Sequence, residues 1–201
     1  MHAGINAIMS GKCSVWSHAA SCGTVRCLEL CLPTRRPIQC RLYKGAMAVI
    51  IRPALPTDAA GIASVLRDLV LAGKRHKRSD PEFALQHYLA NPDRIECHIV
   101  ADDQGMILGF QSLKLAVAGN PYGTPVGWAI IGTHVRPNSV RAGLGKALFS
   151  LTLKTAQSAG VPAIEAFIGA KNLEGQAYYD AMGFADYRRV EGAICKSLYL
   201  H

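Results

Sequence analysis

Residues 133–148 read THVRPNSVRAGLGKAL, a β-type run that ends in a polar loop and continues into an amphipathic helix. Two glycines, Gly143 and Gly145, stand at the turn from strand to helix. Three leucines define the face of the helix that we expect to be buried: Leu144, Leu148 and Leu151. Glycine lets a backbone approach a ligand closely, and the unpaired N–H groups of a first helical turn point at such a ligand. The stretch therefore predicts a site for a phosphate or pyrophosphate group.

Two common kinds of nucleotide site do not match these residues. A P-loop needs a glycine five residues before Gly145, but this chain has Val140. Ser or Thr must also follow the lysine of a P-loop, but Ala147 follows Lys146. A dinucleotide fingerprint would place its third small residue where Leu148 stands. ATP or GTP hydrolysis and NAD binding are therefore unsupported, and a glycine turn without any ligand stays open as the alternative.

Outward from this stretch, the chain alternates between strand and helix patterns. The order is strand, two helices, several strands, helix, strand, helix and further strands, which is typical of an α/β fold. Residues 49–52 form the first strand, residues 56–58 supply the cap of the first helix, and Asp80 with Pro81 begins the second helix. The later strands are predicted at residues 97–101 and 106–117, as a hairpin, and at residues 128–135 and 163–168.

Length and composition indicate a single domain of ordinary size, with or without an appendage. The chain has 201 residues, of which 50 % are hydrophobic, and this is enough to fill one core. Charged residues, Gly or Pro interrupt every apolar run before it reaches the roughly 18 residues of a membrane span. We therefore expect a soluble domain with no membrane partner.

The positive charge of the chain is concentrated near its amino terminus. The formal net charge is +8, and residues 1–46 contribute six Lys and Arg residues against one acid. The remaining 155 residues carry only +3. Because a basic stripe and a reading motif usually accompany nucleic-acid binding, we expect no nucleic-acid partner.

Cysteine is distributed in the same uneven way. Five of the seven cysteines precede residue 47, and their spacing lacks the paired C-x-x-C pattern and the histidine of a zinc site. Two well-separated cysteines, Cys97 and Cys195, remain in the rest of the chain. We therefore expect no disulfide framework, no metal and a reducing, cytoplasmic compartment.

The first 46 residues show neither a sustained helical period nor strand alternation, and a regular pattern begins at Met47. Met47 is one candidate for the start of the functional protein. The alternatives for residues 1–46 are a cleaved basic presequence or an upstream stretch that a mistaken start site includes. We expect residues 1–46 to be an extension that is disordered or outside the functional domain, and residues 47–201 to form that domain.

A second group of motifs lies nearer the carboxyl end. Their order, together with the stretch above, is Val135-x-Pro137, Gly143-x-Gly145, Asn172 and Tyr179-x-x-x-Gly183-Phe184. In this order the chain resembles the GNAT superfamily of acyl-CoA-dependent N-acyltransferases. The resemblance covers residues 49–200 and includes residues 51–54 and 57–58 near its start. One position departs from the family: Val140 stands where Gln or Arg is usual, with Arg141 one place later.

The resemblance implies a fold and a cosubstrate, acetyl-CoA. The fold would be a mixed, strongly twisted central sheet, splayed at its middle and flanked by about four helices. The pantetheine arm would lie in the split beside residues 128–135 and pair with free backbone groups of Thr133 and Val135. Asn172 would bond that arm or cap the next helix. Backbone amides would hold the pyrophosphate, from these residues: Arg141, Ala142, Gly143, Leu144, Gly145 and Lys146.

The resemblance also implies catalytic roles. Tyr179 would lie near the sulfur and donate a proton to the departing thiolate, although Tyr178 or Tyr179 could instead be a packing residue. Many relatives carry a glutamate on the strand at residues 128–135, where this chain has no acid. His134 and Glu165 are the candidate bases in its place. His134 could equally be a hydrogen-bonded sheet residue and Glu165 a solvated strand residue, with the proton leaving through a chain of water.

The function implied is transfer of an acetyl group from acetyl-CoA to a primary amine of a small molecule by direct attack, with no acyl-enzyme. The basic run at residues 74–78 could attract an acidic acceptor, such as an amine that bears a carboxylate, or the 3′-phosphate of the cofactor, or it could be a solvated loop. The loop at residues 119–125 is another candidate wall of the acceptor site. A homodimer is compatible with the family. A non-catalytic acyl-CoA sensor and a nucleic-acid binder that uses residues 1–46 and 74–78 are the rival hypotheses.

Overall fold

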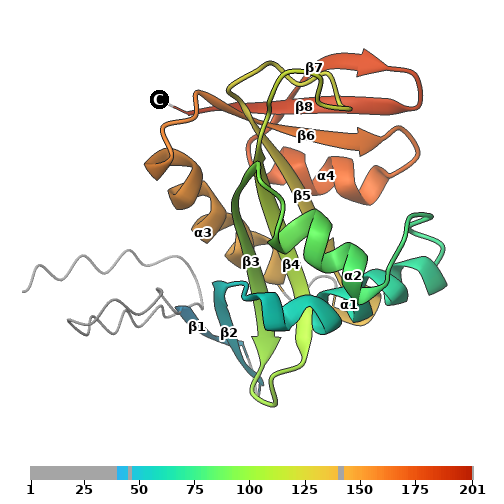
Figure 1. The fold of residues 1–201 in the computed structure, drawn as a ribbon, viewed down its shortest axis with the longest axis vertical. Helices are drawn as coiled ribbons and strands as arrows, with labels where there is room; N and C mark the ends of the chain where they lie inside the picture. Colours follow the sequence, from blue (N-terminus) through green and yellow to red (C-terminus); the bar gives the residue numbers. More distant parts are fainter. Residues whose placement is uncertain (1–39, 45–46, 140–142, 201) are drawn as a thin grey trace, which may run out of the picture.

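The computed structural model describes residues 40–44, 47–139 and 143–200. Within these described ranges, eight strands form one sheet in the order β1-β2-β3-β4-β5-β6-β8-β7 (Figure 1). The strands are β1 (Cys40–Lys44), β2 (Met47–Pro53), β3 (Arg94–Asp102), β4 (Ile107–Leu115), β5 (Ala129–Val135), β6 (Ala163–Gly169), β7 (Ala185–Val190) and β8 (Ala193–Tyr199). The α-helices are α1 (Ala59–Leu71), α2 (Pro81–Ala84), α3 (Leu144–Ser158) and α4 (Leu173–Ala181). Three short turns complete the order: η1 (Pro56–Asp58), the π-helical η2 (Leu85–Leu89) and η3 (Pro137–Ser139).

The sheet is mixed and opens at its middle, as expected from the sequence. Every neighbouring pair of strands is antiparallel except β5 and β6. These two run parallel and are paired at three positions, from Ala129 with Ile164 to Ile131 with Ala166. Beyond that point β5 continues to Val135 and β6 continues to Gly169 without further pairing, and the two ribbons diverge in Figure 1.

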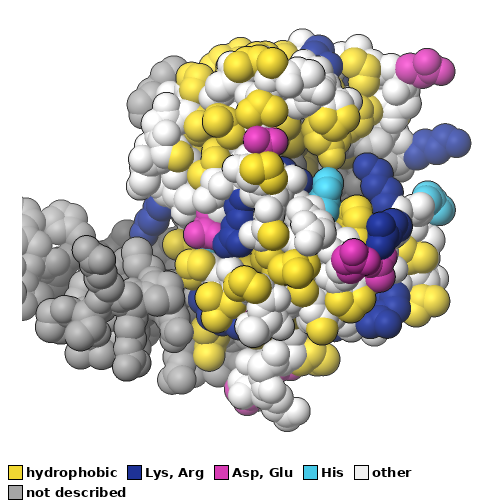
Figure 2. Space-filling model, viewed as in Figure 1, with side chains coloured by type: hydrophobic (Ala, Val, Ile, Leu, Met, Phe, Trp, Pro, Cys, Tyr) yellow, Lys and Arg dark blue, Asp and Glu magenta, His cyan; other side chains and the backbone are white. Residues whose placement is uncertain are grey.

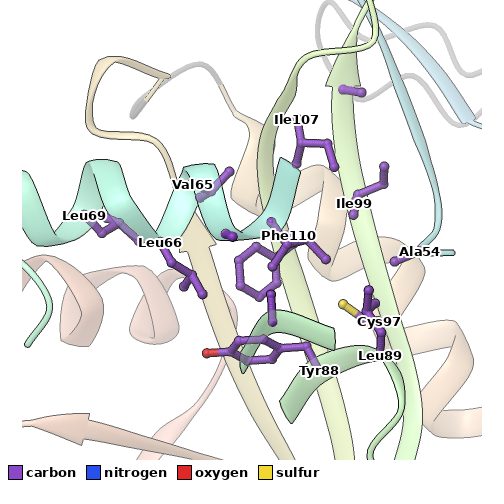
Figure 3. Packing of buried hydrophobic residues seen from close by; sticks show 14 residues of the cluster. Ala54, Val65, Leu66, Leu69, Tyr88, Leu89, Cys97, Ile99, Ile107 and Phe110 are labelled. Atoms are coloured by element: carbon purple, nitrogen blue, oxygen red, sulfur yellow. The ribbon is translucent and has the colours of Figure 1, made fainter. Parts of the chain in front are cut away.

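Strand alternation sends neighbouring residues to opposite faces of the sheet, and each face has its own core. On one face, α1 and η2 pack over Ile99 and Phe110 with side chains that include Leu66 and Tyr88 (Figure 3). On the other face, the adjacent residue Val100 packs with buried leucines of α3. A third cluster joins α3 and α4 to β5 and β6. The sheet is therefore covered on both faces, which explains why so many of its strand residues are apolar.

The helix cap predicted at Asp80 is confirmed, and the helix cap predicted at Asp58 is wrong. Asp80 Oδ1 accepts a hydrogen bond from the N–H of Phe83 at 2.9 Å, as a capping residue does. Asp58 does not cap α1, because its carboxylate turns back to the N–H of Leu55 at 2.7 Å and to the guanidinium of Arg52 at 2.7 and 2.8 Å. The ion pair lowers the pKa of Asp58 against the opposing effect of burial. The predicted cap therefore fixes β2 to the turn before α1.

A strand that the sequence pattern does not indicate lies at the edge of the sheet. β1 pairs with β2 from Cys40 opposite Ile51 to Lys44 opposite Met47. It comes from the segment in which we expected no strand. Edge pairing uses backbone N–H and C=O groups, so it does not require the alternation of side chains from which strands are predicted.

Arg136, the residue after β5, fixes the end of that strand. Its Nε donates to the carbonyl of Ile107 at 2.7 Å, and its Nη2 donates to Ser64 Oγ of α1 at 2.9 Å. Its Nη1 is also ion-paired with Asp68. Because three elements meet at one guanidinium, the chain leaves the sheet toward α3 in a fixed direction. No helix in the described ranges combines the length and apolar character needed to cross a bilayer.

We expect Leu66→Ala to lower the free energy of unfolding by about 2–5 kcal/mol, because Leu66 has no exposed surface and its removal leaves a cavity. Leu71 on the same helix is 83 % exposed, so Leu71→Ala should change stability by less than about 0.5 kcal/mol. Urea unfolding followed by circular dichroism measures both. Equal losses in the two variants would contradict this assignment of the core.

Buried His98 should make the protein sensitive to acid. The side chain is 2 % exposed, its Nδ1 lies 3.0 Å from Thr152 Oγ1, and burial lowers its pKa from 6.5 to about 4. Between these values the unfolded chain binds the proton better, so the free energy of unfolding should fall as the pH decreases. In His98→Gln this dependence should weaken by about 1 kcal/mol per pH unit between roughly pH 4.5 and 6. Urea unfolding over that range measures the slope, and an unchanged slope would contradict the prediction.

Candidate active site

The split between β5 and β6 exposes one edge of a central strand. β5 remains paired with β4 as far as Val135, but its pairing with β6 ends at Ile131. Along the rest of β5 the backbone groups on the β6 side have no partner in the described strands. Such groups bind an extended chain in the same way as a neighbouring strand does. Thr133 and Val135, two residues for which we predict cofactor contacts, lie on this part of β5.

Tyr179 of α4 reaches this part of β5. Its hydroxyl lies 2.9 Å from Thr133 Oγ1, and the side chain is only 6 % exposed. The ring packs edge-on against Tyr178 and Phe184, with centroids 4.9 and 5.1 Å away. Burial raises the pKa of Tyr179 above its ordinary value. The hydroxyl therefore keeps its proton at neutral pH and is able to donate it.

Asn172 fixes the start of the helix that carries Tyr179. Its Oδ1 accepts a hydrogen bond from the N–H of Gly175 at 2.9 Å, which is the geometry of an N-cap. A Cβ added at Gly175 would lie 2.5 Å from the Asn172 amide nitrogen. Of the two roles left open for Asn172, the structure describes capping.

Gln111 of β4, which belongs to none of the sequence motifs, joins these groups into a network. Its Nε2 donates to Thr133 Oγ1 at 2.7 Å and to the hydroxyl of Tyr178 at 3.2 Å. The residue has no exposed surface, and its Oε1 has no hydrogen-bond partner among the described residues. The available signal was a polar residue inside an apolar strand, because such residues are buried only where they are bonded.

Tyr178 continues the network to the glycine turn. Its hydroxyl donates to the carbonyl of Gly145 at 2.8 Å, and a Cβ added at Gly145 would lie 2.8 Å from a carbon of the Tyr178 ring. The sequence pattern predicts that glycine here allows a ligand to approach. The structure adds a second reason, because glycine here lets α3 pack directly against α4.

Gly143 supplies the turn into α3. It is the N-cap residue with φ of +78°, a left-handed conformation that favours glycine. No side chain among the described residues caps this end of α3, and the first helical N–H groups have no partner within a helix. They belong to Leu144, Gly145 and Lys146, three of the predicted cofactor contacts. Two further ones, Arg141 and Ala142, lie outside the described residues.

His134 projects from the face of β5 opposite to that of Thr133. Its ring lies 4.7 Å from the Phe110 ring, and its Nε2 lies 3.4 Å from the Tyr88 hydroxyl. Burial, followed by the charges of Arg75, His87 and Lys77, lowers the pKa of His134 to about 3. An imidazole with so low a pKa is a poor acceptor for a proton from an ammonium group. This argues against the general-base role that the sequence suggested.

Glu165 has its carboxylate occupied by two residues of β7. Oε1 accepts a hydrogen bond from Arg188 Nη2 at 2.8 Å, and Oε2 accepts one from the Tyr187 hydroxyl. The same Arg188 nitrogen donates to the carbonyl of Tyr122 at 2.6 Å. Glu165 has no exposed surface and lies opposite Ile130, within the paired part of β5 and β6. The position suits a structural ion pair, which differs from the candidate base that we expected.

The fold resembles solved acyltransferase structures at low sequence identity. The structure of yncA from Salmonella typhimurium, solved with acetyl-CoA, has a TM-score of 0.61 and 20 % identity and covers 76 % of this chain and 94 % of that one. PaiA N-acetyltransferase from Thermoplasma acidophilum, solved with coenzyme A, has a TM-score of 0.62 and 16 % identity and covers 76 % of this chain and 99 % of that one. Both comparisons show the same fold.

Sequence comparison gives the family. Phosphinothricin N-acetyltransferase from Streptomyces viridochromogenes is 24 % identical over 156 residues, which are 76 % of each chain. The sequence model described as the acetyltransferase (GNAT) family matches residues 63–184, more than half of the chain. The matched range contains β5, the glycine turn and Tyr179. With the split sheet and these motifs in place, the chain belongs to the GNAT family of acetyltransferases.

Proposed function

We propose that this protein transfers the acetyl group of acetyl-CoA to a primary amine of a small molecule, by direct attack and without an acyl-enzyme. The observation that carries the proposal is the hydrogen bond between Tyr179 and Thr133 at the point where β5 and β6 part. A protonated tyrosine at an open strand edge suits a reaction that releases a thiolate. The relative named as a phosphinothricin N-acetyltransferase supports a small-molecule acceptor. In this proposal residues 47–201 form the catalytic domain.

The described residues fit acetyl-CoA at two places. The backbone of Thr133 and Val135, at the open edge of β5, would hold the pantetheine arm. The uncapped amides at the start of α3, continuing the stretch from residue 141 to residue 146, would hold the pyrophosphate. The unpartnered Oε1 of Gln111 is an acceptor close to the same split. When bound, acetyl-CoA supplies a thioester carbonyl and a thiolate leaving group.

The hydrogen-bond network indicates where the hydroxyl proton of Tyr179 points. Gln111 Nε2 donates to Thr133 Oγ1, so the hydroxyl proton of Thr133 is free to point at the Tyr179 oxygen. The proton of Tyr179 then points away from Thr133, and we assign it to the departing sulfur. A backbone N–H near Val135 polarises the thioester oxygen. Since neither His134 nor Glu165 suits the role of base, the amine loses its proton through water.

Release of free thiol from acetyl-CoA by the full chain tests the proposal. The acceptors offered are amino acids, phosphinothricin, polyamines, aminoglycosides and amino-terminal peptides. Turnover with one class of amine is the expected result. Acetyl-CoA binding without turnover of any amine would instead favour a non-catalytic acyl-CoA sensor. Absence of binding would remove the support for both functions.

We expect Tyr179→Phe to lower kcat by about 100-fold, which is typical of the loss of a general acid, with little change in the KM for acetyl-CoA. Tyr199 is 56 % exposed and lies at the end of β8, so Tyr199→Phe is the matched control and should retain full activity. Steady-state kinetics with saturating amine measures both. Full activity in Tyr179→Phe would exclude its role as the acid.

A methyl group at Gly143 should weaken cofactor binding. Gly143→Ala forces an L-residue into a left-handed turn and should raise the Kd for acetyl-CoA by about tenfold, as expected for the loss of roughly one charge-assisted hydrogen bond. Gly160→Ala introduces similar strain, at φ of +68°, beyond the other end of α3. It should lower stability without changing the Kd. Isothermal titration calorimetry distinguishes the two variants, and equal Kd values would contradict the prediction.

A further inference from the structure

The connection between α1 and α2 contains five consecutive basic residues, 74–78, whose charges are not all neutralised. Lys74 Nζ lies 2.6 Å from a carboxylate oxygen of Glu174, and Arg78 Nη2 lies 2.9 Å from one of Asp80. Arg75 and Lys77 form no ion pair within the described parts of the chain. The uncompensated charge of this run is therefore carried by two residues.

A third cation approaches the same place from the sheet. Lys114 of β4 is half-buried, its Nζ lies 5.7 Å from the centroid of the Tyr88 ring, and it forms no ion pair with the described residues. Burial lowers the pKa of Lys114, and Asp93 acts in the opposite sense. The combined field is evident at His87, whose pKa is lowered to about 4 by burial and then by Lys114, Arg75 and Lys77. Arg75 of the α1–α2 connection and Lys114 of β4 therefore approach one region, and Lys77 of the same connection adds to its positive charge.

The same region has an aromatic wall and an unsatisfied donor. The guanidinium of Arg75 lies 5.7 Å from the Phe83 ring centroid, and its buried Nε has no hydrogen-bond partner among the described residues. The Phe83 ring stacks on His87 at 4.9 Å and meets Tyr88 edge-on at 6.0 Å. In Figure 2, Lys, Arg and His side chains gather beside a hollow on this side of the molecule. Like charges that converge on partly buried groups destabilise a fold unless an anion offsets them.

The position of this region relates it to the candidate active site. Tyr88, which contacts both Phe83 and Lys114, also lies 3.4 Å from His134 Nε2 through its hydroxyl. His134 directly follows Thr133 on β5. An anion held by the three cations would therefore lie within the length of a small molecule from the split.

We infer that the amine acceptor, whose existence rests on the proposed function, carries an anionic group such as a carboxylate or phosphinate, and that Arg75, Lys77 and Lys114 bind this group. Its amine then extends past Tyr88 and His134 toward the split. Polyamines and aminoglycosides are excluded as preferred acceptors, because the same cations repel them. The acceptor class is therefore narrowed from amines in general to amino acids and related zwitterions.

Matched pairs of acceptors that differ only in the anionic group test this inference. The full chain is assayed with L-methionine and L-methioninamide, with β-alanine and its amide, and with spermidine. The acid of at least one pair should have a kcat/KM about tenfold or more above that of its amide, the ratio expected for a hydrogen-bonded charge contact. Higher activity with the amides or spermidine would overturn the inference and leave the proposed function intact. Acetyl-CoA binding with no turnover of any amine would contradict the proposed function itself.

Variants distinguish binding by these particular cations from an effect of the net charge of the protein. In Arg75→Gln and Lys114→Met the ratio of kcat/KM for the acid to kcat/KM for its amide should fall by about tenfold. Arg189→Gln removes the same charge from β7, where its side chain is 73 % exposed, and should leave the preference unchanged. A preference that survives both substitutions, or that falls equally in Arg189→Gln, would contradict the assignment.

A readout that needs no turnover uses His87 as a reporter. Isovalerate, a carboxylate without an amine, should raise the pKa of His87 observed by NMR titration, because a bound anion offsets the three cations. Arg75→Gln should raise the same pKa without any ligand and weaken the response to isovalerate. A His87 pKa that does not respond to isovalerate would overturn the inference independently of catalysis.

Discussion

The parting of β5 from β6 after three paired residues is the constraint on which the rest of the site depends. Antiparallel pairing holds β5 to β4 over its whole length and β6 to β8 over its whole length. The half of the sheet that ends with β5 and the half that begins with β6 therefore separate where these two strands diverge. The space beside residues 132–135 is bordered by α4, whose Tyr179 bonds to the side chain of Thr133. A strand edge whose backbone groups have no partner in the described strands and a buried tyrosine hydroxyl therefore lie side by side at this divergence.

Alternation along β5 divides the chemistry of the site between the two faces of the sheet. Thr133 faces α4 and takes part in the network of Gln111, Tyr178 and Tyr179. The next residue, His134, faces η2 and lies in the field of the cations of the α1–α2 connection. In the proposed function, the thioester is handled on the first side and the acceptor is recognised on the second. One strand can serve both because its successive side chains point in opposite directions.

Burial and pairing explain why the two expected bases are unsuited to that role. Burial favours the neutral form of His134 and so lowers its pKa, and the charges of Arg75 and Lys77 act in the same sense. Glu165 is an acid on a central strand, but Arg188 and Tyr187 occupy both of its oxygens and tie β6 to β7 and to the loop at Tyr122. His134 contacts the Tyr88 hydroxyl from the sheet, and Glu165 forms a buried ion pair with Arg188. A direct transfer in which water removes the proton is compatible with both.

Local signals in the sequence determined most of the elements. The order of helices and strands, the start of α2 at Asp80, the glycine turn into α3 and the cap at Asn172 depend on residues a few positions apart, and all are present in the structure. The motif order also placed Tyr179 on the helix that borders the split. These features are predictable because propensity, capping and alternation act over a few residues.

Only the tertiary structure decided which distant side chains meet. Lys74 pairs with Glu174 across 100 positions, and Gln111 reaches Tyr178 across 67. The reversed bond of Asp58, the pairing of β1 and the convergence of three cations on His87 likewise depend on how the strands are ordered in the sheet. Hydrogen bonds and ion pairs act at a few ångströms in space, whatever the separation along the chain. The sequence therefore determined the elements and the motif residues, and the packing of the sheet decided which groups became partners.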